Sequence, residues 1–265
     1  MPEDLPDYAL TAREHWTRSN AEYTNARARQ RWAQEHIHWG VWKNPESELR
    51  ILPDLRGLEV IELGCGTAYF GAWLKKHGAA RVVGVDITPA QLETARAMNE
   101  EFGLGLEFIE ANAEDVPLPD GSFDLAFSEY GASIWCDPFK WIPEAARLLR
   151  PAGELVFMCN TDLVQVCSPD EERVSERLVL PLRGMHRLDW TSEGASTEFH
   201  IPTADMFGLL RRTGFEILDY RQLYAREDAV DHPYYSYVPA EWARKWPSEE
   251  VWRAGRLSGS PGRMA

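Results

Sequence analysis

The chain has 265 residues, of which 44% are hydrophobic and 26% are charged, an ordinary composition for a globular protein. Its formal net charge of −14 argues against partners of dense negative charge, because nucleic acids and anionic membrane surfaces are bound through exposed Lys and Arg. We therefore expect no nucleic-acid partner and no membrane contact.

The N-terminal sequence lacks the basic start and apolar core of a signal peptide, and no stretch is long and apolar enough to span a bilayer. The cysteines at positions 65, 136, 159 and 167 form no CxxC pair and show no metal-ligand spacing. We expect reduced thiols in a cytoplasmic protein, with a zinc site at Cys159 and Cys167 as the alternative.

The first third of the chain begins with a predicted helix and an aromatic stretch. Residues 7–33 are predicted to be helical because small and aromatic side chains share one face, namely Ala9, Ala12, Trp16, Tyr23 and Ala26. Residues 36–42 (HIHWGVW) follow, and a turn at 44–45 leads toward the first strand. We expect residues 1–56 to form a helical lid.

A glycine turn follows the first predicted strand, which runs from Val60 to Leu63. Gly64 and Gly66 come directly after it, and a helical pattern then places Phe70, Trp73, Leu74 and His77 on one face before Gly78. Strand, glycine turn and helix in this order open the nucleotide pocket of a doubly wound α/β domain, because glycine lets the backbone approach a ligand closely.

Strands and helices alternate over the rest of the region 57–159. Further strands are predicted at 81–86, 106–110, 122–128 and 154–159. The helix after the second strand has Thr88 as N-cap, Pro89 in the first turn and Gln91 in the capping-box position. This alternation predicts a doubly wound α/β fold with a parallel sheet, whose ligand lies at the carboxyl ends of the strands.

The regular alternation stops after Asn160. Residues 160–202 carry charges, prolines and glycines with little periodicity, so we expect an insertion that caps the carboxyl edge of the sheet. The region 203–257 is predicted to complete the sheet, with a helix at 203–213, a strand at 215–223, a helix at 240–246 and a last short strand at 251–252. We expect the tail, 258–265, to be disordered.

Two nucleotide types compete for the glycine loop. A dinucleotide fingerprint needs a third glycine where this chain has Tyr69, which favours S-adenosylmethionine over a nicotinamide dinucleotide. S-adenosylmethionine has no phosphate, and it needs an acid for its ribose hydroxyls and a polar partner for adenine. Asp86, 22 residues after Gly64, ends the second strand and can accept both ribose hydroxyls.

Three motifs in order resemble the class I S-adenosylmethionine-dependent methyltransferases, of the small-molecule group that includes ubiquinone and menaquinone methyltransferases. They are residues 60–67 (VIELGCGT), residues 110–124 (EANAEDVPLPDGSFD) and residues 147–157 (RLLRPAGELVF). The resemblance implies a Rossmann-like, mostly parallel seven-stranded sheet with helices on both faces. It also implies S-adenosyl-L-methionine as cofactor, with S-adenosyl-L-homocysteine as product.

The resemblance also implies a set of cofactor contacts. Asn112 and Ala113 match the positions that contact adenine, although many relatives carry Asp where this chain has Asn112. Glu62 suits either the methionine amino group or a buried hydrogen bond to loop amides. We expect the remaining cofactor contacts from the residues around these positions: Gly64, Cys65, Gly66, Thr67, Asp86, Ile87, Gln91, Glu114, Ser128 and Glu129.

Other side chains are candidates for the methyl-transfer region. Aromatic faces attract a sulfonium, so Tyr23 and Trp39 are candidate lid contacts to the cofactor, although packing explains most of the N-terminal aromatics. Glu129 and Tyr130 follow the fourth strand, where the family faces both methyl donor and acceptor. His186 and His200 in the insertion are candidate bases, with Tyr130 and His186 predicted as catalytic.

The predicted function is methyl transfer to a small-molecule acceptor by in-line displacement, with O-, N- and C-methylation all open. No metal is required, because the leaving group is a neutral thioether. The alternatives are a nicotinamide-dependent oxidoreductase, a binding protein that keeps the pocket without the reaction, and a methyltransferase that acts on protein or RNA.

Overall fold

Seven strands form the main sheet of the computed structural model, in the order β10–β11–β7–β6–β3–β4–β5. The model describes residues 5–169, 173–191 and 196–258, so the tail predicted to be disordered lies, apart from Ser258, outside the described residues. The strands are β3 (Glu59–Leu63), β4 (Arg81–Asp86), β5 (Glu107–Glu110), β6 (Phe123–Glu129), β7 (Leu149–Asn160), β10 (Phe215–Leu223) and β11 (Glu249–Arg256). Because β11 pairs antiparallel with β7 and β10 while β3 to β7 pair in parallel, the predicted mostly parallel sheet is confirmed.

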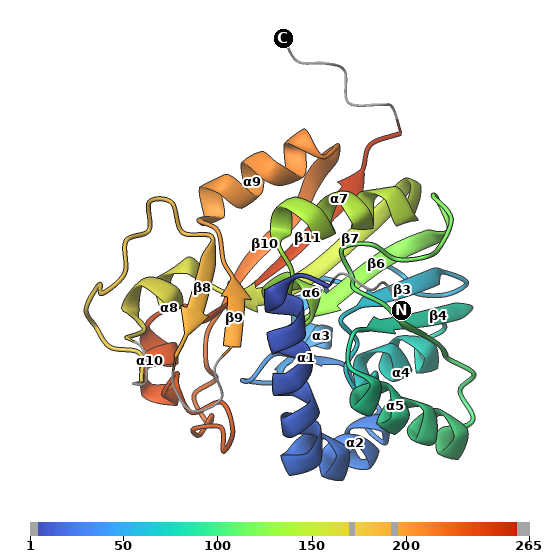
Figure 1. Ribbon diagram of the computed structural model, residues 1–265, viewed down its shortest axis with the longest axis horizontal. Helices are drawn as coiled ribbons and strands as arrows, with labels where there is room; N and C mark the ends of the chain where they lie inside the picture. The colour runs from blue at the N-terminus through green and yellow to red at the C-terminus, as the bar shows by residue number, and fades with distance from the viewer. Residues whose placement is uncertain (1–4, 170–172, 192–195, 259–265) are drawn as a thin grey trace.

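Helices cover both faces of this sheet (Figure 1). Helices α7 (Pro138–Leu148) and α9 (Thr203–Arg212) bury side chains such as Trp141 and Leu209 against one face. Helices α4 (Tyr69–Lys76) and α5 (Pro89–Phe102) cover the other face, where Phe70 and Leu92 belong to a second buried cluster. The shorter elements are α2 (Asn25–Trp32), α3 (Glu46–Leu49), α6 (Ala132–Trp135), α8 (Asp162–Cys167), α10 (Ala240–Lys245), β1 (His38–Trp39) and β2 (Asn44–Pro45).

Strand β3 marks the switch point of the sheet. Its neighbours are β4, which follows it through α4, and β6, which follows later in the chain. The chain therefore adds β4 and β5 on one side of β3 and then crosses over to add β6 and β7 on the other side. A ligand of a doubly wound sheet binds in the crevice at the carboxyl ends of the strands at such a point.

The N-terminal helix is interrupted by a π-helical turn. Helix α1 (Asp7–Ser19) continues through a π segment (Asn20–Thr24) into α2. A π turn holds more residues than an α turn, which rotates the following side chains around the axis. The prediction that Ala26 lies on the buried face was therefore wrong: Ala26 is exposed, and Ala28 is buried instead.

The capping box predicted at the start of α5 does not form. The side chain of Thr88 makes no capping hydrogen bond with the described residues, and the backbone N–H of Thr88 donates to Asp86 Oδ1 at 2.8 Å. The acid at the end of β4 therefore accepts the backbone N–H that a capping box would give to Gln91. The side chain of Gln91 is left for another partner.

The segment between β7 and α9 contains α8 and a hairpin of β8 (Arg187–Trp190) and β9 (Ser196–Phe199). Figure 1 shows this hairpin beside α1, where the rings of Tyr8 and Phe199 pack edge to face, 4.9 Å apart.

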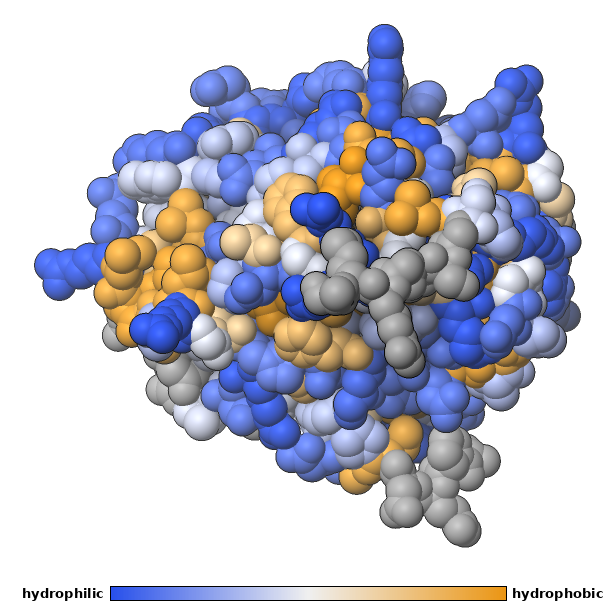
Figure 2. Space-filling model, turned by 90° about the horizontal axis from the view of Figure 1, so that it is seen from above, coloured by the Kyte–Doolittle hydropathy of each residue, from blue (hydrophilic) through white to orange (hydrophobic). Residues whose placement is uncertain are grey.

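Seen from above, hydrophobic side chains gather at the left edge of a mainly hydrophilic surface (Figure 2). Among the described helices, none is long and apolar enough to cross a membrane.

Candidate functional site

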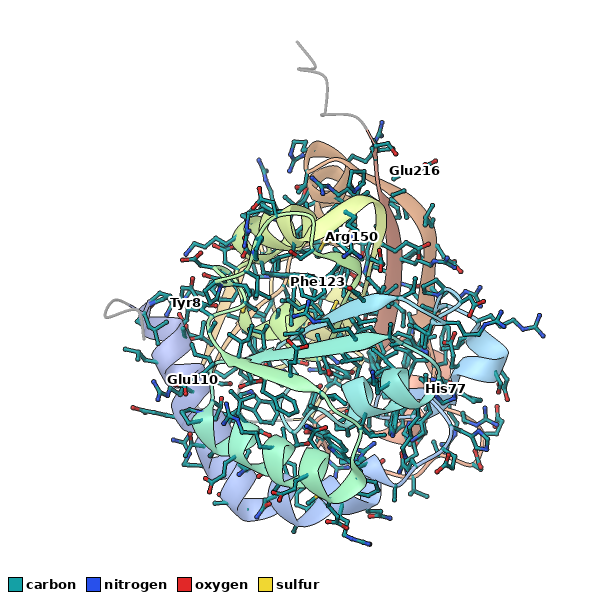
Figure 3. The ribbon with its side chains drawn as sticks, turned by 90° about the vertical axis from the view of Figure 1, so that its right-hand side faces the viewer. Tyr8, His77, Glu110, Phe123, Arg150 and Glu216 are labelled. Carbon is teal, nitrogen blue, oxygen red and sulfur yellow. The ribbon has the colours of Figure 1, made fainter. Side chains whose placement is uncertain are left out.

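A cavity of about 520 Å³ lies between the carboxyl ends of the central strands and the N-terminal helices. Its lining includes residues of the glycine loop, of the ends of β4 and β6, and of α1 and α2. Figure 3 shows Tyr8 of α1 and Glu110, the last residue of β5, at the same end of the strands, with His77 at the opposite end. The cavity thus occupies the edge that the glycine-loop argument predicted.

The glycine loop is held at two points. The backbone N–H groups of Gly64 and Cys65 both donate to Val85 O at 2.9 Å, which ties the loop to β4. Gly64 has a φ of 75°, and a Cβ there would lie 2.6 Å from the backbone nitrogen of Ala132. Only glycine fits this position, because the next loop of the sheet passes directly against it.

Asp86 lies at the centre of the loop contacts. Its Oδ2 accepts from the N–H of Gly66 at 2.7 Å, and its Oδ1 accepts from the N–H of Thr88 at 2.8 Å. Burial raises the pKa of this carboxyl, and the backbone N–H groups of Thr88 and Gly66 oppose that shift. An ionised carboxylate has about four acceptor positions, so acceptor capacity remains for a ligand in the cavity.

Gln91 presents an unused acceptor to the cavity. The residue is only 3% exposed, and its Oε1 has no hydrogen-bond partner among the described residues. A Cβ added at Gly66 would lie 3.5 Å from this oxygen, so the amide faces the glycine loop. Because a buried acceptor without a partner costs about 1–3 kcal/mol, the site favours a ligand that brings a hydrogen-bond donor here.

Asn112 and Glu62 already have partners in the protein. Asn112 lines the cavity, and its Oδ1 accepts from the N–H of Glu114 at 3.1 Å. Glu62 Oε2 accepts from the N–H of Gly71 at 2.9 Å, an amide of α4 rather than of the loop. Burial raises the pKa of Glu62 well above its ordinary value. Glu62 is nevertheless one of the residues that line the cavity.

The far end of the cavity is formed by the residues after β6. Glu129 accepts from the hydroxyl of Tyr69 at 2.9 Å, and burial raises the pKa of its carboxyl. The next residue, Tyr130, has a φ of 50° and donates its hydroxyl to Glu249 Oε1 at 2.6 Å. Trp135 also lines this end. The lining here combines hydroxyl, carboxyl and aromatic groups.

Aromatic side chains from the two ends of the chain meet over the cavity. The rings of Tyr23 and Tyr234 stack 4.3 Å apart, and the hydroxyls of Tyr23 and Tyr235 lie 3.1 Å from each other. Trp16 meets Trp135 edge to face at 5.4 Å. The N-terminal helices and the segment 232–237 thus cover the cavity together.

Most of the predicted site residues line the cavity. They are Tyr23, Glu62, Gly64, Cys65, Gly66, Thr67, Asp86, Ile87, Gln91, Asn112, Ala113, Glu129 and Tyr130.

Four predicted site residues are not among the described lining residues. Trp39 is fully buried and donates its Nε1–H to Glu46 at 2.6 Å, and Ser128 is buried and donates to Leu63 O at 2.9 Å. Glu114 accepts from the hydroxyl of Tyr8 at 2.7 Å, and His186 Nε2 lies 3.0 Å from Asp137 Oδ1. These four side chains have partners in the packing around the cavity.

His200, the second candidate base, is buried and is not among the described lining residues. Its Nε2 lies 2.9 Å from Glu198 Oε2, and Glu198 is the member of this pair that lines the cavity.

Sequence analysis missed several lining residues. Arg31 of α2 lies with its guanidinium 5.1 Å from the ring centroid of Tyr69. Asn160, Tyr235 and Tyr237 also line the cavity. The segment HPYYSY at 232–237 carries three tyrosines in six residues, a composition that could have marked it as a binding segment.

Comparison with known proteins finds similarity in the central part of the chain. Residues 61–157 match the family model described as a methyltransferase domain. The demethylmenaquinone methyltransferase of Thermus thermophilus is 37% identical over 100 residues, which cover 37% of this chain and 46% of that protein. The chain thus spans about half the length of this relative.

Two solved structures share the fold over most of the chain. An S-adenosylmethionine-dependent methyltransferase from Mesorhizobium loti is 24% identical, with a TM-score of 0.64 over 80% of this chain and 96% of that one. The geranyl diphosphate C-methyltransferase from Streptomyces coelicolor is 13% identical, with a TM-score of 0.67 over 97% of this chain and 100% of that one. That structure is a complex with Mg²⁺, geranyl diphosphate and S-adenosyl-L-homocysteine.

Proposed function

We propose that the protein is a class I methyltransferase, because residues 61–157 match a methyltransferase-domain model, and that it transfers a methyl group from S-adenosylmethionine to a small-molecule acceptor. The observation that carries this proposal is the juxtaposition of the glycine loop, Asp86 and the unpartnered Gln91 Oε1 in one cavity. A nucleoside with free ribose hydroxyls supplies the donors that Asp86 and Gln91 would accept.

The residues present fit this cofactor. Asp86 and Gln91 would take the ribose, and Asn112 and Ala113 would lie at adenine. The guanidinium of Arg31 would form an ion pair with the carboxylate at the amino-acid end of the cofactor. Glu62 or Glu129 would accept a hydrogen bond from the cofactor's ammonium group. When bound, S-adenosylmethionine supplies an activated methyl group on a positively charged sulfur.

The chain contributes positioning and exclusion of water. Positioning can be a large effect, because effective molarities of about 10⁵–10⁸ M are known for well-oriented reactants. The stacked rings of Tyr23 and Tyr234 would close the cavity over the bound molecules, with the N-terminal helices as a lid. Such a closed, partly aromatic cavity suits a small acceptor better than a protein or RNA chain.

Isothermal titration with S-adenosylhomocysteine and with NAD⁺ tests the cofactor. We expect micromolar binding of S-adenosylhomocysteine and none of NAD⁺, and the reverse result would establish the oxidoreductase instead. Transfer of labelled methyl from S-adenosylmethionine to a metabolite extract then tests the reaction. Label found only in protein or RNA would contradict a small-molecule acceptor, and binding without any transfer would support a binding protein.

A further inference from the structure

Glu249 is a buried acid that reaches the acceptor end of the cavity through Tyr130. It is the first residue of β11 and is only 1% exposed. Its Oε1 accepts from the hydroxyl of Tyr130 at 2.6 Å and from the N–H of Val41 at 2.7 Å. Its Oε2 is buried with no hydrogen-bond partner in the described part of the chain. Glu249 is thus a proton acceptor held against a residue that lines the cavity.

A chain of hydrogen bonds leads from the cavity to this carboxyl group. Tyr237 donates its hydroxyl to Asn160 Oδ1 at 3.1 Å, and Asn160 Nδ2 donates to Tyr130 Oη at 3.3 Å. Tyr130 Oη in turn donates to Glu249. A phenolic oxygen has one donor hydrogen and two acceptor positions, so Tyr130 keeps one acceptor position for a donor in the cavity.

The backbone holds Tyr130 in this place. Its φ of 50° lies in the left-handed region, which is uncommon for a bulky residue and costs about 1–3 kcal/mol. The N–H of Tyr130 donates to Met158 O at 3.2 Å, and a Cβ on the following Gly131 would lie 2.4 Å from Gly64 O. The turn that carries Tyr130 is therefore packed directly against the glycine loop, next to the proposed methyl donor.

We propose that Tyr130 and Glu249 form a proton relay for an acceptor hydroxyl, and that the acceptor is a phenol. This inference rests on the proposed function. Burial and the neighbouring Glu249 raise the pKa of Tyr130 well above its ordinary value. Tyr130 therefore gives its proton to Glu249 only as it takes one from the acceptor phenol, whose pKa in water is near 10. The aromatic lining from Trp135 and Tyr237 suits a flat ring beside Tyr130.

The acceptor oxygen forms a bond to the methyl carbon while the carbon–sulfur bond breaks and its electron pair stays on sulfur. The O–H bond of the acceptor breaks, and its proton goes to Tyr130 Oη. The phenolic proton of Tyr130 goes to Glu249 Oε1. Tyr130 would be the catalytic residue, and Glu249 would be the positioning residue that acts through it.

The surroundings of Glu249 suit it to this role. Burial raises the pKa of its carboxyl group to about 8, and the nearby carboxylate of Glu129 adds to this shift. The hydroxyl of Tyr130 and the N–H of Val41 act in the opposite direction, and the charge of Glu249 in turn raises the pKa of Tyr237. Since the relay needs the ionised form, the transfer rate should rise with pH up to about 8 and then level off.

The first test needs no acceptor. In protein labelled with ¹³C at the Glu carboxyl groups, one carboxyl resonance should titrate near pH 8 and be absent in Glu249→Gln. In Tyr130→Phe its pKa should rise, because a hydrogen bond to the ionised form is lost. Titration of this resonance near the ordinary value of glutamate, or no response to Tyr130→Phe, would overturn the relay. The result of this titration does not depend on whether a given phenol is methylated.

The second test measures methyl transfer to catechol and 4-methylphenol, two phenols that stay protonated at pH 8, against pH. Glu249→Gln and Tyr130→Phe should lose the rise with pH and be about 10²–10⁴-fold slower at pH 8, the usual contribution of a positioned base. Glu250→Gln is the matched control, because Glu250 is also buried on β11 but accepts from Tyr220 and Trp252 instead. Its profile should keep the wild-type shape.

The two proposals fail in different ways. If the wild-type protein does not bind S-adenosylhomocysteine, the proposed function is refuted. If it binds and methylates these phenols, but Glu249→Gln retains the wild-type pH profile, the relay alone is refuted.

Discussion

Replacing Asp86 with Asn tests the cofactor site most directly. In the protein each carboxylate oxygen accepts one backbone N–H, from Gly66 at 2.7 Å and from Thr88 at 2.8 Å. An amide has one oxygen, so its NH₂ group would face the second N–H and leave that donor unsatisfied, at a cost of about 1–3 kcal/mol. Asn also removes the charge that burial disfavours at this position, so we expect a stability loss near the lower end of that range.

The effect on binding should be larger than the effect on folding. Hydrogen bonds to a charged group contribute about 1.5–3 kcal/mol, so affinity for S-adenosylhomocysteine should fall roughly 10–150-fold. Isothermal titration measures the affinity, and urea denaturation shows that the variant is folded.

Asp124→Asn is the control for this substitution. Asp124 likewise accepts a backbone N–H, from Glu59 at 2.9 Å, but it does not line the cavity. Its substitution should leave the affinity unchanged. A folded Asp86→Asn protein that binds S-adenosylhomocysteine as tightly as the wild type would refute the assignment of Asp86 to the ribose.

Two further predictions concern stability. A Cβ at Gly71 would lie 2.6 Å from the buried Glu62 Oε2, so Gly71→Ala should lower the free energy of unfolding by about 1–3 kcal/mol. A Cβ at Gly208 would contact only the flexible end of Arg212, so Gly208→Ala should be neutral or stabilise the fold by up to about 1 kcal/mol. Equal effects of Gly71→Ala and Gly208→Ala in urea denaturation would contradict this reasoning. Burial raises the pKa values of Glu249 and Glu250 to about 8 and 7, so the native state binds more protons than the unfolded state above the ordinary glutamate pKa. The free energy of unfolding should therefore fall as pH rises from 5, by up to about 1.4 kcal/mol per unit for each group, until pH 7 for Glu250 and pH 8 for Glu249. Glu249→Gln should flatten the profile, and a flat wild-type profile would disprove this.

The elements of the sheet were largely predictable because their signals are local. Alternating apolar strands and amphipathic helices predicted β3 to β6 and β10 within one residue, and the fold class was confirmed. Strand β7 was predicted at 154–159 but begins five residues earlier, at Leu149. The last strand was predicted at 251–252 but runs over Glu249–Arg256. Two consecutive glutamates do not resemble a buried strand, and both are buried only because β11 lies between β7 and β10.

The candidate site was predictable where it depends on a short motif. The glycine loop and Asp86 lie close in the sequence, and a strand–loop–helix unit places them together whatever the rest of the chain does. By contrast, Tyr23 pairs with Tyr235 across 212 residues, and Tyr130 with Glu249 across 119. No local pattern carries such a pairing.

The sequence by itself therefore determined the α/β fold class and the glycine loop with its acid at the end of β4. Both follow from local backbone preferences and apolar periodicity. Only the tertiary structure decided which tyrosines cover the cavity, that Trp39 belongs to the core, and that a buried carboxyl group lies behind Tyr130. These features depend on which distant segments meet, and burial in that packing is what raises the pKa of Glu249.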